Sequence, residues 1–183
     1  MASRVQAPNH LRRIRVALGV FIAGLVLSGL TAFPLATEVR WLAAALHAGP
    51  IQPLAQSIGL LAWIDRVNEA LATTSARYPF LAYGTDWLAF AHLVIASAFI
   101  GPWIDPVRNK WVVTFGLIAC AGVVPLALIA GAVRGIPWGW RLIDCSFGLV
   151  GSVPLFICRR SIRTLESEQP PRVPPESPEP ADE

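Results

Sequence analysis

The sequence is poor in charged residues, in cysteine and in the short motifs of soluble enzymes. Charged side chains make up only 15% of its 183 residues. The three cysteines show no C-x-x-C or other metal-ligand spacing, so neither a metal site nor a dithiol redox centre is expected. No P-loop, dinucleotide-binding glycine motif, H-E-x-x-H or G-x-S-x-G is found, so the signatures of common soluble enzymes are missing. The enzyme question stays open, although these absences favour a protein that is not an enzyme.

Apolar residues, in contrast, make up 54% of the chain and are concentrated in long runs. An apolar run of about 18 or more residues indicates a transmembrane helix, which needs roughly that length to cross the hydrocarbon core. Four runs qualify, at residues 16–33, 87–104, 111–133 and 138–158. The sequence therefore predicts an all-α integral membrane protein, a four-transmembrane-helix bundle in a lipid bilayer.

Basic residues at the span ends predict the topology. Cytoplasmic segments are enriched in Arg and Lys. The basic residues before the first span, between the second and third spans and after the fourth are Arg4, Arg12, Arg13, Arg15, Arg108, Lys110, Arg159, Arg160 and Arg163. We therefore expect both termini in the cytoplasm, and the plasma (bacterial inner) membrane by default, because no organelle signal is apparent. Because these residues do not form one face of a soluble domain, nucleic acid is not an expected partner.

The two terminal segments differ from the spans. Residues 1–15 form a basic segment, and the apolar run after it is longer than that of a signal peptide, which predicts an uncleaved anchor. Residues 164–183 are rich in Pro, Glu and Ser, a composition that cannot bury enough apolar surface to order itself. We expect this acidic tail to be disordered.

The outer loop at residues 34–84 is predicted to contain one or two amphipathic helices. Residues 37–48 end at Gly49-Pro50, a common helix end. A second helix is predicted from about residue 53 to 73, because apolar residues recur there at helical spacing. These are Leu54, Ile58, Leu61, Ile64, Val67 and Leu71. We expect this helix to lie in the outer membrane interface or to cap the bundle.

Arg141 and Asp144 are the most informative residues, because an ionisable group at the centre of a span costs about 2.5–3.5 kcal/mol. Their i, i+3 spacing allows an ion pair that holds the helices in register. Alternatively, Asp144 belongs to an outward-facing ligand site with Arg134 and with Asp86 at the outer end of the second span. The structural interpretation is favoured, because both residues lie within about two turns of the span's start.

His92 is the only histidine at membrane depth. An imidazole there can relay protons or ligate haem. Haem with two histidine ligands would need a second intramembrane histidine, which the sequence lacks. No cofactor is therefore predicted, and haem or pigment binding through His92 stays a weaker alternative.

The segment between the second and third spans has two interpretations. Asp105 suits a helix N-cap and Pro106 suits the first helical position. Arg108 and Lys110 then serve as anchors at the membrane surface. The alternative is a contact surface for another protein, formed by Asp105, Arg108, Asn109 and Lys110.

Small residues predict close helix packing. Gly24 with Ser28, and Gly148 with Ser152, are small-xxx-small pairs that allow two helix backbones to approach. They support a tight bundle or an oligomer. The cysteines within the spans are expected to be buried as small apolar residues, while Cys158, beside two arginines, has palmitoylation as an alternative.

Two functional hypotheses follow. The first is an accessory, assembly or signalling subunit of a larger membrane complex, because four spans with few polar interior groups leave little room for a transport path. The second is a small-molecule transporter or membrane enzyme whose site contains Asp86, Arg134, Arg141 and Asp144. The expected protein partner is another membrane protein or a second copy of the chain.

Overall fold

The computed structural model describes residues 3–168, and side chains from residue 9 onward, as an all-helical protein. The elements are α1 (Ser3–Ala32), α2 (Leu35–Ala48), α3 (Gln52–Ser57), α4 (Leu60–Arg77), the 3₁₀ turn η1 (Pro79–Leu81), α5 (Ala82–Ala98), α6 (Ile100–Ile104), α7 (Lys110–Val133) and α8 (Trp138–Glu168). Four segments are long and apolar enough to cross a membrane: Asn9–Ala32, Pro79–Ile104, Lys110–Val133 and Trp138–Glu168. The predicted four-helix fold class is confirmed.

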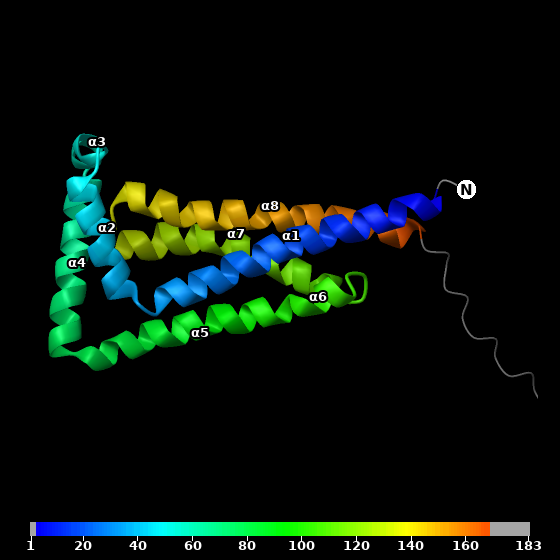
Figure 1. Ribbon diagram of the computed structural model, residues 1–183, viewed down its shortest axis with the longest axis horizontal. Coiled ribbons are helices and arrows are strands. Elements are labelled where there is room, and N and C mark those ends of the chain that lie inside the picture. The colour runs from blue at the N-terminus through cyan, green and yellow to red at the C-terminus, as the bar shows by residue number, and fades with distance from the viewer. Residues whose placement is uncertain (1–2, 169–183) are drawn as a thin grey trace, which may run out of the picture.

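The long helices run side by side, and α2 to α4 lie across one end of them (Figure 1). We call this end the cap end. At the opposite end lie the start of α1, the turn between α6 and α7, and the end of α8 (Figure 1). We call it the basic end, after its residues Arg12, Arg13, Arg15, Arg108, Lys110, Arg159, Arg160 and Arg163.

The spans are arranged as a row in the order α5, α1, α8, α7. α1 packs on both α5 and α8, and α8 packs on α7, whereas α5 has no extensive contact with α7 or α8. The row is closed only toward the basic end, where the Phe99 ring packs edge-on against Phe21 of α1, with 4.7 Å between centroids. A side chain at Gly116 of α7 would collide with Phe99 and with Leu155 of α8. Most of the core therefore lies in the half of the row nearer the basic end.

Close approach of the helices depends on glycine, because lipid offers apolar side chains as good an environment as a neighbouring helix does. A Cβ on Gly148 of α8 would collide with the backbone carbonyl oxygen of Cys120 in α7. A Cβ on Gly29 of α1 would lie 2.9 Å from the carbonyl oxygen of Ala89 in α5. Both outer pairs of the row are thus in backbone contact at a glycine.

The second span is broken near the basic end. It was predicted as one run over residues 87–104, but the helix is interrupted at Phe99, between α5 and α6. Pro102 accounts for the break, because its nitrogen has no hydrogen to donate to the carbonyl of Ala98 and its ring crowds that carbonyl. The break directs Phe99 into the core, where it is fully buried.

The cap contains three helices rather than two. The predicted helix at about residues 53–73 is divided into α3 and α4 by Gly59, whose φ of 75° is left-handed. The row of apolar residues along the predicted helix is divided at the same point. Leu61 and Ile64 are buried against α2, whereas Leu54 of α3 and Ile58 just after it are 62% and 66% exposed. The single amphipathic face was therefore wrong, because a left-handed residue ends the helix and changes its direction.

α8 is longer than the predicted fourth span. It runs to Glu168, five residues into the segment predicted to be a disordered tail, and residues 169–183 lie outside the described part of the chain. Ile162 and Leu165 are buried with Ile14 of α1. The helix persists past the apolar run because its last two turns still have α1 to pack against.

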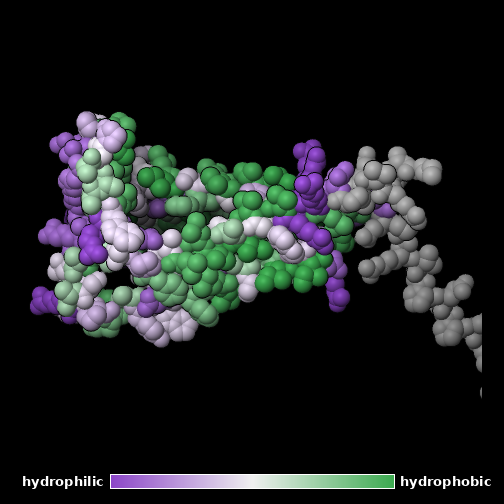
Figure 2. Space-filling view, in the orientation of Figure 1, coloured by the Kyte–Doolittle hydropathy of each residue, from purple (hydrophilic) through white to green (hydrophobic). Residues whose placement is uncertain are grey.

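The surface between the two ends is hydrophobic (Figure 2). Within the most apolar part of each span at most 22% of residues are buried in the chain, and only 11% in α7. Tyr78, Tyr83, Trp87 and Trp138 are exposed near the cap end, as a belt at the membrane interface requires. Trp140 is instead half-buried, because it packs against Trp63 of the cap with centroids 6.5 Å apart.

Candidate functional site

The Arg141 side chain joins three elements at the cap end. Its Nε donates a hydrogen bond to the carbonyl oxygen of Ile136, at 2.8 Å, and its guanidinium carbon lies 5.3 Å from the centroid of the Trp138 ring. Its aliphatic part packs on Gly131, where a Cβ would come within 2.7 Å of it. Arg141 thus ties the first turn of α8 to the last turn of α7 and to the loop between them.

The loop that Arg141 binds is a helix C-cap. Gly135 adopts a φ of 68°, its N–H donates to Ala132, and the N–H of Ile136 donates back to Gly131. This Schellman arrangement satisfies the last carbonyls of α7. It also turns the Ile136 carbonyl toward Arg141, which explains why the arginine is held here.

The predicted ion pair between Arg141 and Asp144 is not formed. Among the described residues, the ion pairs within 4.0 Å are His47–Asp65 and Lys110–Glu166. The expectation was wrong because Arg141 reaches back to Ile136 and Trp138, away from the following turn of its own helix. Arg141 does hold α7 and α8 together, but its partners are the carbonyl oxygen of Ile136 and the indole ring of Trp138.

Asp144 instead lines a small groove between α7 and α8. The groove has a volume of about 250 Å³, and its lining also includes Arg134, Ala127 and Ala130. Asp144 is half-buried and Arg134 is exposed, and the two form neither an ion pair nor a hydrogen bond within the described chain. The structure therefore brings together two of the four predicted charged residues, with apolar walls between them.

We expect Asp144→Asn to leave the stability of the protein within about 0.5 kcal/mol of the original, because no described partner is lost. The measurement is thermal unfolding of the purified variant in detergent. A loss of about 1.5 kcal/mol or more would instead indicate that Asp144 pairs with Arg141 in the folded protein.

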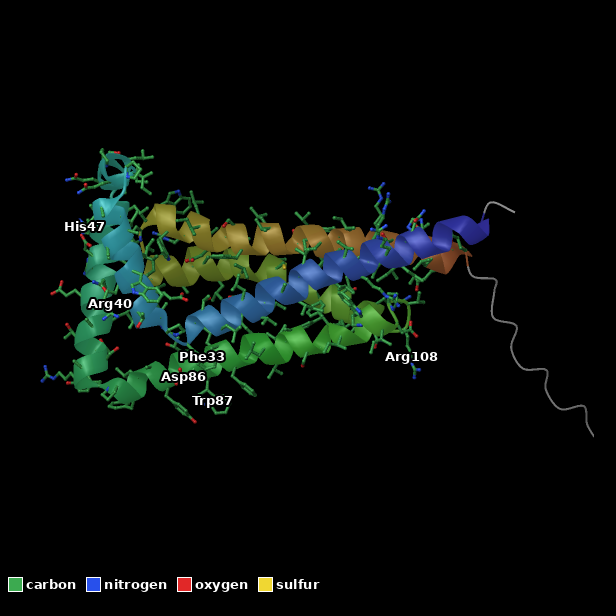
Figure 3. The ribbon with its side chains drawn as sticks, in the orientation of Figure 1. Phe33, Arg40, His47, Asp86, Trp87 and Arg108 are labelled. Atoms are coloured by element: carbon green, nitrogen blue, oxygen red, sulfur yellow. The ribbon has the colours of Figure 1, made fainter. Side chains whose placement is uncertain are left out.

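Asp86 and His92 belong to a different part of the row. Both lie on α5, which packs on α1, and Asp86 lies toward the cap end (Figure 3). Nδ1 of His92 lies 2.8 Å from the carbonyl oxygen of Leu88 in its own helix, so Nδ1 carries the hydrogen. His92 is also packed against Gly29 of α1. The structure does not bring Asp86 or His92 to the groove of Asp144.

The turn between α6 and α7 is organised by its own polar groups. The Asp105 carboxylate accepts a hydrogen bond from the N–H of Arg108, at 3.0 Å, but α7 begins only at Lys110. Asp105 therefore caps a turn, and the predicted N-cap of the third span was wrong. The Asn109 amide donates to the carbonyls of Gly101 and Asp105, which fixes the turn against α6.

The two cations of this turn have different surroundings. Lys110 pairs with Glu166 of α8, with Nζ and Oε1 2.6 Å apart. Arg108 is exposed at the basic end (Figure 3). Of the predicted contact residues, Asp105, Arg108 and Lys110 are exposed, and Arg108 is the cation among them without an ion-pair partner in the described residues.

One contact of the cap was missed from the sequence. Nε2 of His47 in α2 lies 2.9 and 3.1 Å from the two carboxylate oxygens of Asp65 in α4. The two residues are 18 positions apart on separate helices, so no local pattern indicates the pair. It fixes α2 against α4 above the buried pair Leu46 and Ile64.

The cysteines are all buried. Cys158 is fully buried, and its thiol lies 3.6 Å from the carbonyl oxygen of Ile14. A thiol in that position is closed to acylation, so palmitoylation of Cys158 is excluded in this fold. The described residues also contain no group of three or more His, Cys, Asp or Glu side chains placed to hold a metal ion.

Comparison with known proteins adds no assignment. No protein-family model, curated protein or solved structure matches the chain.

Proposed function

We propose that the chain is a non-enzymatic accessory, assembly or signalling subunit that docks on a larger membrane protein through an outward face of α1. We define this Gly24 face as Gly24, Leu27 and Ser28, which are all exposed. The partner is a membrane protein whose own helix packs along this face at bilayer depth.

The observation that carries the proposal is the open space at Gly24. A Cβ at Gly24 would meet nothing within 4 Å, whereas Gly29 and Gly148 are in contact with neighbouring helices. Gly24 and Ser28 form a small-xxx-small pair, the arrangement that lets a second helix approach. α1 thus has one glycine, Gly29, that packs against α5, and another, Gly24, that contacts no neighbouring helix of the chain.

Gly122 of α7 provides a matched comparison. It also has open space where a Cβ would lie. Its neighbours four positions away are Ile118 and Leu126, which keep another helix at a distance. Open space alone therefore does not distinguish the two glycines, but the small residue at position 28 does.

The row of spans supports a docking role over a transport path within one chain. Because α5 has no extensive contact with α7 or α8, the row of spans is closed only near the basic end, where α6 contacts α7. The most polar interior group, Arg141, is already used to hold α7 to α8. A helix in contact with the Gly24 face would cover the middle of the row, where α1 lies between α5 and α8.

We also propose that the basic end lies in the cytoplasm. Among the residues that the structure describes, eight basic side chains gather there against the acidic residues Asp105, Glu166 and Glu168. At the cap end the basic and acidic residues are balanced: Arg40, Arg66, Arg77, Arg134 and Arg141 against Glu38, Asp65, Glu69, Asp86 and Asp144. This asymmetry is the one that the positive-inside bias produces.

The test is purification of the tagged protein from its native membranes in mild detergent, followed by mass spectrometry of what accompanies it. We expect a second membrane protein at constant stoichiometry, and we expect Gly24→Leu to release it because the new side chain fills the space of the partner's backbone. Gly122→Leu is the control and should retain the partner. Recovery of the original chain alone, or only as a homo-oligomer, would overturn the proposal.

A second candidate is a small-molecule site at Asp144, favoured by the groove that it shares with Arg134. If Asp144→Asn keeps the protein level and its partner but removes a cellular phenotype of the deletion, the groove is the functional site. If the phenotype is unchanged, this candidate is excluded.

A further inference from the structure

Two grooves flank Arg12 at the basic end. One, of about 450 Å³, is lined by Leu11, Arg12, Arg15, Val16, Gly19 and Trp103. The other, of about 900 Å³, is lined by Asn9, Arg12, Arg13, Val16, Ala17, Val20, Val153, Pro154 and Ile157. Both are open at the surface of the bundle and share Arg12 and Val16. Each has one further arginine of its own.

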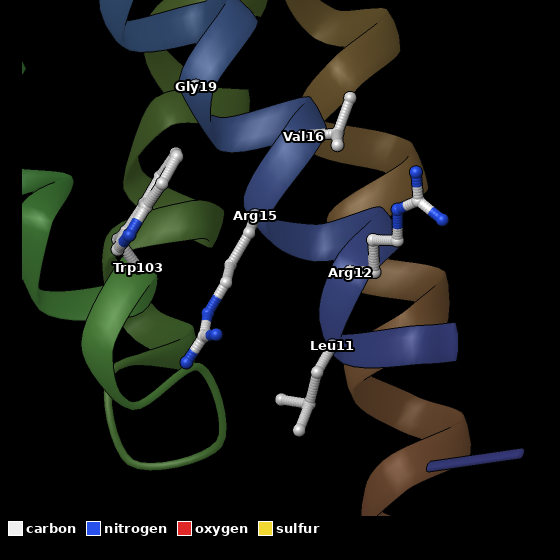
Figure 4. Close-up of a pocket in the computed structure, with 6 residues that line it drawn as sticks. All are labelled: Leu11, Arg12, Arg15, Val16, Gly19 and Trp103. Atoms are coloured by element: carbon white, nitrogen blue, oxygen red, sulfur yellow. The ribbon is translucent and has the colours of Figure 1, made fainter. Parts of the chain in front are cut away.

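The smaller groove lies between α1 and α6. The Trp103 ring packs on α1 so closely that a Cβ at Gly19 would lie 2.9 Å from it. Arg15 extends on the side of Trp103, and Arg12 extends to the other side of α1, toward α8 (Figure 4). The groove therefore has an apolar wall toward the middle of the bilayer and a cation at its mouth.

The larger groove lies between α1 and α8. Its lining toward the middle of the bundle consists of the aliphatic side chains of Val20 and Val153, and Ile157 lines it nearer the arginines. At its mouth are Arg12, Arg13 and the amide of Asn9. Both grooves are thus basic at the end of the bundle and become apolar toward its middle.

These arginines are not neutralised within the described chain. Among the described residues, the acidic ones at the basic end are Asp105, Glu166 and Glu168. The Asp105 carboxylate accepts the backbone N–H of Arg108, and Glu166 pairs with Lys110. Arg12, Arg13 and Arg15 are exposed and form no ion pair or hydrogen bond with any residue from 9 to 168. Three cations thus lie within one turn of α1, at the basic end of the candidate span Asn9–Ala32.

We propose that this end of the protein binds an anionic glycerophospholipid from the surrounding leaflet. Its phosphates contact Arg12 with Arg15 and Arg13, and its acyl chains lie in the two grooves on either side of Arg12. Basic pockets between transmembrane helices with apolar walls suit such lipids, because one molecule supplies both the anion and the chains. A diphosphatidylglycerol fits best, because it carries two phosphates and has acyl chains on both sides of the bridging glycerol. The site does not depend on the protein partner at the Gly24 face.

The binding experiment uses the full chain in phosphatidylcholine nanodiscs with added diphosphatidylglycerol, phosphatidylglycerol or phosphatidylethanolamine, and counts retained lipids by native mass spectrometry. We expect retention in the order just given, because the lipids carry two, one and no net negative charges. Equal retention of phosphatidylethanolamine and diphosphatidylglycerol would overturn the proposal. Millimolar inorganic phosphate is added separately, and if it removes the lipid completely, the site recognises a free anion instead.

Matched variants separate a specific site from diffuse attraction. Arg12→Gln with Arg15→Gln should weaken diphosphatidylglycerol binding about thirtyfold, if each arginine near the surface contributes as basic residues usually do. Arg160→Gln with Arg163→Gln removes the same charge from α8 outside both grooves and should change binding by less than about threefold. Equal losses in the two double variants would mean that the protein only attracts anionic lipid by its overall charge.

A neutral variant tests the grooves themselves. Val16 lines both grooves and is 60% exposed, so Val16→Trp should fill them and reduce lipid retention with the arginines intact. Ile118→Trp on α7 is the control, since Ile118 is similarly exposed, at 58%, and lines neither groove. Unchanged retention in Val16→Trp would contradict the proposed placement of the acyl chains.

Discussion

Gly148→Ala is expected to destabilise the protein by about 1–3 kcal/mol, as overpacking of a close contact usually does. The added methyl group would collide with the carbonyl oxygen of Cys120 and lie 3.2 Å from the Cβ of Val123. A backbone oxygen cannot move aside as a flexible side chain can, so α7 and α8 must separate. The measurement is equilibrium unfolding in mixed micelles, with the helix content recorded by circular dichroism.

Gly122→Ala is the matched control for this prediction. Position 122 has open space, so an added methyl group should be neutral or slightly stabilising through its better helix propensity. If the two alanine variants have the same stability, the close approach of α7 and α8 at Gly148 is wrong. A loss at Gly148 alone supports the packing described here.

Replacing Arg141 with methionine is expected to cost about 1.5–3 kcal/mol, the usual range for a hydrogen bond that involves a charged group. Methionine keeps the apolar contact with Gly131, but it leaves the Ile136 carbonyl without its side-chain donor and removes the cation over the Trp138 ring. The same unfolding experiment measures the loss. Arg134→Met is the control, because Arg134 is exposed and should contribute little.

A double-mutant cycle then tests which residue Arg141 interacts with. Because Arg141 and Asp144 form no ion pair, Arg141→Met and Asp144→Asn should be additive within about 0.5 kcal/mol. A larger coupling energy would show that Arg141 and Asp144 do interact, as the i, i+3 spacing predicted. If Arg141→Met and Arg134→Met are equally stable, Arg141 does not stabilise the contact between α7 and α8.

The spans were predictable because hydropathy depends on composition over a long window. The four apolar runs lie within the four candidate spans except at Phe33, one residue past the end of the first. The contact at Gly148 was predictable for a related reason, since a glycine in a span with a small residue four positions on leaves room for another helix. The residues around Gly148 do not indicate which helix packs there.

The errors lie where a single backbone angle or a distant contact decides the outcome. Gly59 interrupts an apolar stripe that is otherwise regular, and only its left-handed φ shows that the helix ends there. Leu165 lies past the apolar run in a polar segment, and it is buried because α1 extends equally far. Arg141 has an acidic neighbour at helical spacing, but the carbonyl of a Schellman turn five residues earlier takes the hydrogen bond.

The candidate site was partly predictable. Arg134 and Asp144 share a groove, as the outward-facing hypothesis required, while Asp86 lies on α5 at the other side of the row. A sequence gives the depth of each residue in the membrane but not the order of the helices around it. Arg12 and Arg15 were expected only as topology signals, because the grooves beside them are formed jointly with Trp103 and α8.

The most direct test of the docking proposal is photo-crosslinking in intact native membranes. A photoreactive amino acid at Leu27, which is 63% exposed on the Gly24 face, is compared with one at Ile118 on α7. We expect a discrete adduct at position 27, heavier than the chain alone and different in mass from its homodimer, that disappears with Gly24→Leu and is not formed from position 118. Only lipid adducts or a homodimer at position 27 would contradict the proposal that a different membrane protein covers this face.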